Sequence, residues 1–222
     1  APAARAQLPA SPLVHRSMSP QTVLKIGAAL IAAFFAVEAV RIRVATPAVQ
    51  GPTLAQQVQS QSPQQTPTTE AAFGFKGFTL RPLARLDLQA RVLRREDYHL
   101  GKEADLSPFD LALGWQRMAD PAVFEHLNIS QGRRWYFYSW RDQPPIPVQE
   151  IVRSSANMHL IPANAAMERA LRKVRGGEFI RLRGLLVKAT HPNGWHWTSS
   201  LSRTDSGAGS CELMYVEAVQ VE

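Results

Sequence analysis

The chain has 222 residues, of which 45% are hydrophobic and 19% charged, and its formal net charge is +7. This length fits one domain of ordinary size with extensions. Residues 1–72 carry five basic and two acidic side chains, so the longer C-terminal part has only a mild excess of positive charge. Such a balance disfavours nucleic acid as a partner. The single cysteine, Cys211, excludes a disulfide within the chain and a metal site built on paired thiolates.

The apolar segment 21–45 is the most informative feature of the N-terminal part. Its central residues, 26–40, contain Glu38 as their only charge. Glu38 can pair with Arg41 three positions later, which lowers the cost of placing it near a membrane. A helix needs about 20 residues to cross a hydrocarbon layer of ~30 Å. We therefore predict an N-terminal tail over 1–20 and a single membrane anchor over 21–45. The apolar side chains that would hold the anchor in lipid are Leu24, Ile26, Leu30, Ile31, Phe34, Phe35 and Val37.

Three other interpretations of this segment compete with a membrane anchor. A cleaved signal peptide would need small residues at the cleavage site, and Arg41 and Arg43 crowd that position. A buried helix of a soluble domain has a similar length. An amphipathic surface helix would need a polar face, whereas apolar residues go almost all the way round here.

The orientation of the predicted anchor is inferred from the C-terminal part of the chain. Positive charges before and after the segment are equal in number, so they do not decide the orientation. The segment leads into a spacer and a folded domain, which favours a cytoplasmic N-terminus. We therefore expect a single-pass protein of the inner (plasma) membrane with its C-terminal domain on the periplasmic, or extracytoplasmic, side.

Residues 46–72 have the composition of a spacer. From Gln56 to Thr69 the chain has no charge and almost no apolar side chain. Such a segment buries too little surface to offset the entropy lost on ordering. We predict a flexible linker rich in Gln, Pro and Thr, followed by a soluble β-rich domain over 73–222.

The first elements of that domain are predicted from local patterns. Residues 84–93 alternate apolar and polar side chains, as a half-buried strand does. Ser107 followed by Pro108 is typical of a helix start and predicts a short helix over 108–114. Asp120 and Pro121 repeat that signal for a second helical turn. The aromatic run 134–140 has the composition of a strand.

The C-terminal part has clearer signals. We expect 154–164 to be extended, with Asn164 capping a helix over 165–174. The Asn-Gly pair within 191–194 is a hairpin signal. The predicted strands are 178–189, 195–201 and, after a loop of 202–210, 211–221. The fold class is therefore α+β: an N-terminal transmembrane helix, a flexible linker, and a mainly antiparallel β domain with short helices. A partly open barrel of the oligonucleotide/oligosaccharide-binding (OB) type is one form that fits this order of elements.

One polar cluster in the extended segment raises the question of catalysis. A hydrolase would use Ser155 as nucleophile and His159 as base. However, no Gly-x-Ser-x-Gly turn surrounds the serines. Along a strand the two side chains share a face but lie about 13 Å apart. Structural roles for the serines and Asn157 as partners of backbone groups fit better. We therefore expect that the protein is not an enzyme. In the alternative, in which it is a hydrolase, Ser155 and His159 would be the catalytic pair.

No metal site and no cofactor are expected. His191, His196, Cys211 and Glu212 lack the short repeated spacing of metal ligands. The loop 205–209 lacks both the Lys-Ser/Thr pair of a phosphate-binding loop and the alternating acids of a calcium-binding loop.

Aromatic and basic residues of the predicted strands are candidates for binding. They could form a stacking platform for a polyanion or a glycan, or the rings could instead fill the core of a small domain. The candidates are Tyr136, Tyr138, Trp140, Trp195, Trp197, Arg181 and Arg183.

Together these patterns favour a membrane-anchored binding or assembly protein. Its β-rich domain would dock to an envelope or membrane-protein complex, and its partners would be the membrane and other subunits of that complex. The first alternative is an OB-like module that binds a polyanion or a glycan. The second is the hydrolase described above.

Overall fold

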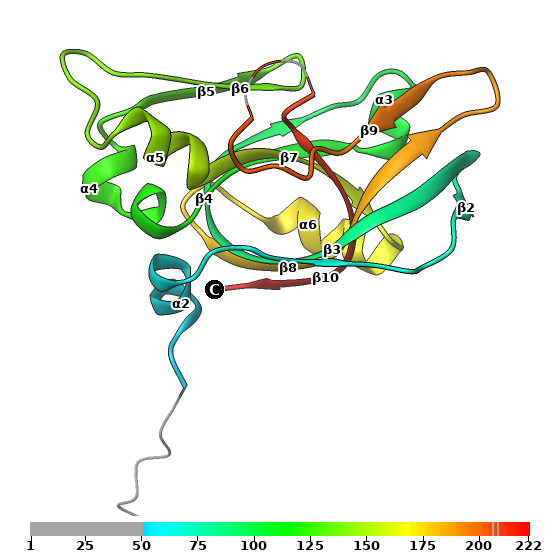
Figure 1. The fold of residues 1–222 in the computed structure, drawn as a ribbon, viewed down its shortest axis with the longest axis horizontal. Helices are drawn as coiled ribbons and strands as arrows, with labels where there is room; N and C mark the ends of the chain where they lie inside the picture. The colour runs from blue at the N-terminus through cyan, green and yellow to red at the C-terminus, as the bar shows by residue number, and fades with distance from the viewer. Residues whose placement is uncertain (1–50, 206, 208) are drawn as a thin grey trace, which may run out of the picture. The chain divides into compact units, whose positions relative to one another are not determined.

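The computed structural model describes residues 51–205, 207 and 209–222. The predicted tail and membrane anchor, with every anchor residue from Leu24 to Val37, lie outside the described residues. Within residues 51–222 as described, none of the helices reaches the length and hydropathy that a bilayer crossing requires. The described residues belong to one compact unit, Gly51–Glu222 (Figure 1).

This unit is a mixed α+β domain with a mainly antiparallel sheet and short helices, as the sequence predicts. Its strands are β1 (Gln64–Pro67), β2 (Phe73–Phe75), β3 (Phe78–Asp97), β4 (Phe109–Gly114), β5 (Asn128–Gly132), β6 (Trp135–Ser139), β7 (Ser155–Pro162), β8 (Phe179–Thr190), β9 (His196–Thr198) and β10 (Glu212–Val221). Its helices are α2 (Leu54–Ser60), α3 (Lys102–Leu106), the 3-10 helix η1 (Gln116–Ala119), α4 (Pro121–Phe124), α5 (Val148–Arg153) and α6 (Ala165–Lys173).

Five strands pair in a closed circuit. β3 pairs with β4, β4 with β7, β7 with β10, β10 with β8, and β8 pairs again with β3. Only the β7–β10 pairing in this circuit is parallel. β3 can serve two partners because it is long: Arg91–Asp97 pairs with β4, and Thr79–Arg91 pairs with β8. Register shifts in both pairings increase the local bend of the strand, and β3 curves around the domain in Figure 1.

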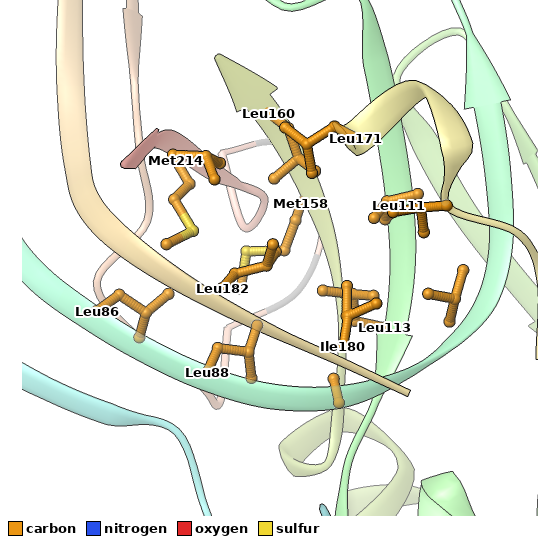
Figure 2. Packing of buried hydrophobic residues seen from close by; sticks show 14 of the residues in the cluster. Leu86, Leu88, Leu111, Leu113, Met158, Leu160, Leu171, Ile180, Leu182 and Met214 are labelled. Carbon is orange, nitrogen blue, oxygen red and sulfur yellow. The ribbon is translucent and has the colours of Figure 1, made fainter. Parts of the chain in front are cut away.

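The hydrophobic core fills the inside of this circuit. Alternate residues of β3 point inward, so the predicted pattern of residues 84–93 is confirmed. They meet side chains of β4, β7, β8 and β10 (Figure 2). Leu171 of α6 joins the same cluster, as do Leu54 and Val58 of α2. The labelled core residues are Leu86, Leu88, Leu111, Leu113, Met158, Leu160, Leu171, Ile180, Leu182 and Met214.

The predicted helix over 108–114 is wrong, because residues 109–114 form the strand β4. All six residues of β4 are buried, and their backbone groups pair with β3 on one side and β7 on the other. Phe109, Leu111 and Leu113 alternate into the core. The pairing with two neighbouring strands therefore overrides the local helix-start signal of Ser107 and Pro108.

Residues 54–67 differ from the flexible linker that their composition predicts. Thr53 caps α2 with a reciprocal bond to Gln56, and Val58 of α2 is fully buried in the core. The backbone N–H of Leu54 donates to Oε2 of Glu222 over 2.7 Å, which joins the start of α2 to the chain end. β1 pairs with β3. Two well-placed apolar side chains and a strand pairing order a segment that is polar overall.

Several local predictions are confirmed. Asp120 caps α4 by accepting from the N–H of Ala122, and Asn164 caps α6 by accepting from two backbone N–H groups. The strands predicted near 134–140, 178–189 and 211–221 correspond to β6, β8 and β10. The turn at 191–194 joins β8 to β9 in an antiparallel pair.

Residues 115–154 form an insertion between β4 and β7. Its strands β5 and β6 make a separate two-stranded hairpin. Its helices pack around a small cluster of their own, against which Tyr138 and Trp140 also lie. In Figure 1 this hairpin lies next to β7, at the end of the domain away from α2.

Candidate functional site

The outer face of β4 and β7 carries polar side chains that are nevertheless buried. Asp110 of β4 is 0% exposed, and His159 of β7 is 2% exposed. They point away from the core because their neighbours Leu111 and Met158 point into it. The β5–β6 hairpin covers them, since its residues bond directly to this face.

Arg134, at the tip of the hairpin, is the centre of these contacts. Its guanidinium donates to Oδ1 of Asp110 over 2.7 Å and to the carbonyl of Ser107 over 2.8 Å. The guanidinium also stacks on the ring of Tyr98, 3.7 Å from the ring centroid. The backbone N–H of Arg134 donates to the Tyr98 hydroxyl. Groups from β4 and from the loop between β3 and β4 thus hold one residue of the hairpin.

The turn that presents Arg134 is itself strained. Arg133 and Arg134 connect β5 to β6 with φ angles of 53° and 68°. Positive φ at both positions suits a two-residue hairpin turn, but for residues other than glycine it costs roughly 1–2 kcal/mol each. The contacts of Arg134 with Asp110 and Tyr98 compensate for this strain, so the turn and the buried charge depend on each other.

His159 is part of the same cluster. Its Nδ1 lies 2.9 Å from Oδ1 of Asp110, and its ring lies 4.5 Å from the ring of Trp197, centroid to centroid. Asn157, two residues earlier on β7, accepts from Nε2 of Gln131 and donates to the carbonyl of Arg134. The polar residues of the segment 154–164 therefore mainly attach the hairpin to the main sheet.

A hollow of about 300 Å³ lies beside this cluster, between β6, β7 and the loop that leads to β10. Glu212, at the start of β10, lines it and is 1% exposed. Burial raises the pKa of the Glu212 carboxyl to about 7, although the nearby Arg203 acts in the opposite direction. Burial likewise raises the pKa of the Cys211 thiol to about 11, which keeps this thiol protonated at neutral pH.

The alternative catalytic pair is not joined in the structure. Ser155 donates from Oγ to the carbonyl of Ile151 over 2.8 Å, and Tyr136 donates to the same Oγ over 3.4 Å. His159 faces Asp110 and Trp197 instead. Each of the two residues thus has its own set of partners, and no hydrogen bond between them occurs among the described residues.

The candidate binding residues lie in three separate places. Tyr136 and Tyr138 on the inner face of β6 and Trp140 just after it form a row, with ring centroids 5.5 and 6.5 Å apart between neighbours. Trp195 and Trp197 pack in a second hydrophobic cluster around Phe78 and Val187.

The two candidate arginines lie in the third place, on β8. Arg181 forms two hydrogen bonds with Asp87, and Arg183 is exposed two positions later. β9, which carries Trp197, pairs with β8 from Lys188 onward, so it lies about 17 Å further along the strand than Arg183. These residues do not form one continuous platform.

The outer face of the hairpin was not singled out in the sequence. Trp135 is 39% exposed and Phe137 is 53% exposed, and both lie on the face of β6 opposite Tyr136 and Tyr138. Together with Arg133 and Gly132 they line a shallow hollow of about 560 Å³. Alternation along β6 could have indicated this face, because Tyr136 and Tyr138 must point the opposite way.

Charged residues within apolar strands were the signal that sequence reasoning missed. Asp110 interrupts Phe109 and Leu111, and Glu212 precedes Leu213, yet both are almost fully buried. Among the described residues no group of three or more His, Cys, Asp and Glu side chains is placed to hold a metal ion. Comparison of the chain with protein-family models, with curated proteins and with solved structures finds no match.

Proposed function

We propose that this chain is a single-pass membrane protein whose domain of residues 51–222 docks to a protein subunit of an envelope or membrane complex and has no catalytic activity. The observation that carries the proposal is the outer face of the β5–β6 hairpin, where Trp135 and Phe137 are exposed beside Arg133. Tryptophan and arginine are enriched among the residues that dominate protein interfaces.

The order of strands supports a binding scaffold. The circuit β3-β4-β7-β10-β8, with α6 between β7 and β8, follows the order expected of an OB-like barrel. Such barrels bind their ligands on the face of the second and third strands, here β4 and β7. In this chain the β5–β6 hairpin covers that face, so a macromolecule approaching it meets the outer side of the hairpin first.

The polar residues Ser155 and His159 of β7 support the proposal, because their side chains already contact other groups of the domain. Ser155 donates to a backbone carbonyl, and Nδ1 of His159 lies 2.9 Å from an oxygen of the buried Asp110 carboxylate. Among the described residues, the two side chains do not form the hydrogen bond between nucleophile and base that nucleophilic catalysis requires. The exposed face offers apolar surface with one positive charge, so we expect a partner with a complementary apolar patch flanked by acidic side chains.

The membrane part of the proposal comes from the hydropathy of residues 21–45. A cytoplasmic N-terminus would place the docking domain on the periplasmic side. Anchoring in the same membrane as the partner raises the effective concentration of the domain, so a modest interface is sufficient for assembly.

The test is co-purification of the full chain from membranes in detergent. We expect the wild-type chain to carry a defined partner subunit, and a W135A/F137S variant to lose that partner by at least about tenfold, because each truncated anchor residue costs more than about 1 kcal/mol of binding. Leu100→Ser is the matched control, since Leu100 is 92% exposed and lies outside the hairpin.

Two results would contradict the docking proposal. One is a wild-type chain that purifies from membranes without any stoichiometric partner. The other is a W135A/F137S variant that folds as the wild type does, by circular dichroism, and retains the partner as fully as the Leu100→Ser variant.

A further inference from the structure

A second feature of the domain, a hollow that Trp135 and Phe137 also line but that contains buried polar groups, has the properties of a small-ligand site. The 300 Å³ hollow between β6, β7 and the loop before β10 has the volume of a pocket for a small molecule. Tyr136 and Tyr138 form one wall, and Asn157 and Glu212 contribute buried polar groups. Rings opposite a few buried polar groups are the usual composition of such sites.

Among the described residues, the Glu212 carboxylate has a hydrogen-bond partner for only one of its oxygens. Oε1 pairs with the guanidinium of Arg203, whereas Oε2 is buried and has no hydrogen-bond partner among the described residues. A buried acceptor without a partner loses its hydration and gains nothing in return. A bound group that donates a hydrogen bond to Oε2 would remove this cost.

Two kinds of ligand bring hydrogen-bond donors next to aromatic rings: ammonium groups and sugar hydroxyls. An ammonium group placed at the Glu212 carboxylate would lie close to the guanidinium of Arg203, which repels it. An acidic sugar would meet the carboxylate of Asp205, which also lines the hollow. A neutral sugar avoids both problems, since its hydroxyls both donate and accept and its apolar face stacks on tyrosine rings.

We propose that this hollow binds one unit of a neutral glycan, with a sugar hydroxyl donating to Oε2 of Glu212 and the sugar face stacked on Tyr138. Arg203 and Asp205, which also line the hollow, offer further donors and acceptors to hydroxyls of the same unit. The hollow shares Trp135 and Phe137 with the docking face, so the test substitutes Glu212 and Tyr138, which are not residues of that face. Calorimetry with sugars and co-purification of a protein partner therefore test the two proposals separately.

The test is calorimetric titration of the full chain, kept in a zwitterionic detergent without a sugar headgroup. The probes are three neutral trisaccharides (maltotriose, cellotriose and chitotriose), with trigalacturonate and spermidine for the acidic and cationic alternatives. At about pH 8, where the Glu212 carboxyl is mostly ionised, we expect at least one neutral trisaccharide to bind, and Glu212→Gln to weaken that binding about tenfold, as the loss of one charge-assisted hydrogen bond does. Glu217→Gln, on an exposed position of the same strand, is expected to leave the affinity unchanged.

Tyr138→Leu and Asp205→Asn keep the proposal testable should Glu212→Gln fail to fold. Tyr138→Leu keeps apolar volume but removes the stacking surface, so we expect a loss of about tenfold or more. Asp205→Asn keeps hydrogen bonding and should reduce the affinity less than about threefold. Failure of all three neutral trisaccharides to bind at millimolar concentration would overturn the proposal. Tighter binding of trigalacturonate or spermidine than of any neutral sugar, or wild-type affinity in folded Glu212→Gln or Tyr138→Leu, would overturn it too.

Discussion

Single residues in this domain show that a buried charge is compensated by residues that are distant from it in the sequence. Asp110 sits in an apolar strand and is nearly inaccessible, yet it faces both Arg134 and His159. Removing one partner of a buried ion pair leaves an uncompensated charge, which costs far more than the pair itself contributes. The position of the β5–β6 hairpin is therefore fixed by a few charged contacts, in addition to the apolar packing of its inner face.

The stability of the domain is expected to change with pH because of Glu212. Burial raises the pKa of its carboxyl from 4.5 to about 7, so the folded state binds the proton more tightly than the unfolded chain. The resulting stabilisation is complete below about pH 4.5 and is lost as the pH rises through 7, with a magnitude of about 3 kcal/mol. Thermal unfolding followed by circular dichroism should show a melting temperature that falls between about pH 5 and pH 8.

The variant Glu212→Gln should lose most of this slope, because the amide does not titrate. Glu217→Gln, on the exposed side of β10, should keep it. A Glu212→Gln chain whose melting temperature falls with pH as steeply as that of the wild type would show that another group is responsible.

At the scale of secondary-structure elements, predictions from local sequence signals were correct where the element depends mainly on residues close in sequence. Asn164 and Asp120 cap the helices that come directly after them, since a cap needs only the next three residues. The alternation in β3 and the Asn-Gly turn before β9 were likewise readable, because each depends on contacts close in sequence or on one buried face.

The structure of other elements depends on contacts with residues distant in the sequence. The helix-start signal of Ser107-Pro108 was overridden, because the backbone of β4 pairs with β3 on one side and β7 on the other. The polar composition of residues 54–67 did not indicate that two of them, Leu54 and Val58, pack in the core. The candidate site was the least predictable part, since Arg134 and Asp110 are 24 residues apart and Glu212 pairs with Arg203 across a loop.

Gly184 is an element-scale feature with a testable consequence. A Cβ atom at this position of β8 would collide with the carbonyl oxygen of Tyr215, where β8 and β10 approach each other closely beside a register shift. Gly184→Ala should therefore destabilise the domain by roughly 2–4 kcal/mol, because rigid backbone must move on both strands. The measurement is the midpoint of denaturant unfolding.

Gly176→Ala is the matched control, since a Cβ there meets nothing within 4 Å. It should leave the midpoint nearly unchanged. Equal midpoints for Gly184→Ala and the wild type would mean that the close approach of the two strands relaxes at little cost.

At the scale of the whole molecule, the proposed protein combines a membrane anchor with a binding domain. Placing Leu30→Arg and Phe34→Arg near the centre of the predicted span should abolish membrane association, because each arginine costs about 2.5–3.5 kcal/mol at that depth. Extraction of membranes with alkaline carbonate measures the effect. A control with Gln59→Arg and Gln61→Arg adds the same charge to exposed positions at the end of α2 and should stay in the membrane fraction. Release of the wild-type chain by carbonate would contradict the anchor.

The long strand β3 also determines when the chain can finish folding. Its first half pairs with β8, and partners such as Asp87 and Arg181 are 94 positions apart. Contacts between such distant residues must overcome a large loop-closure entropy, and they are associated with slow folding. During synthesis, Leu86 and Leu88 therefore remain exposed until β8 has left the ribosome, and this interval is when the nascent chain is most vulnerable to aggregation.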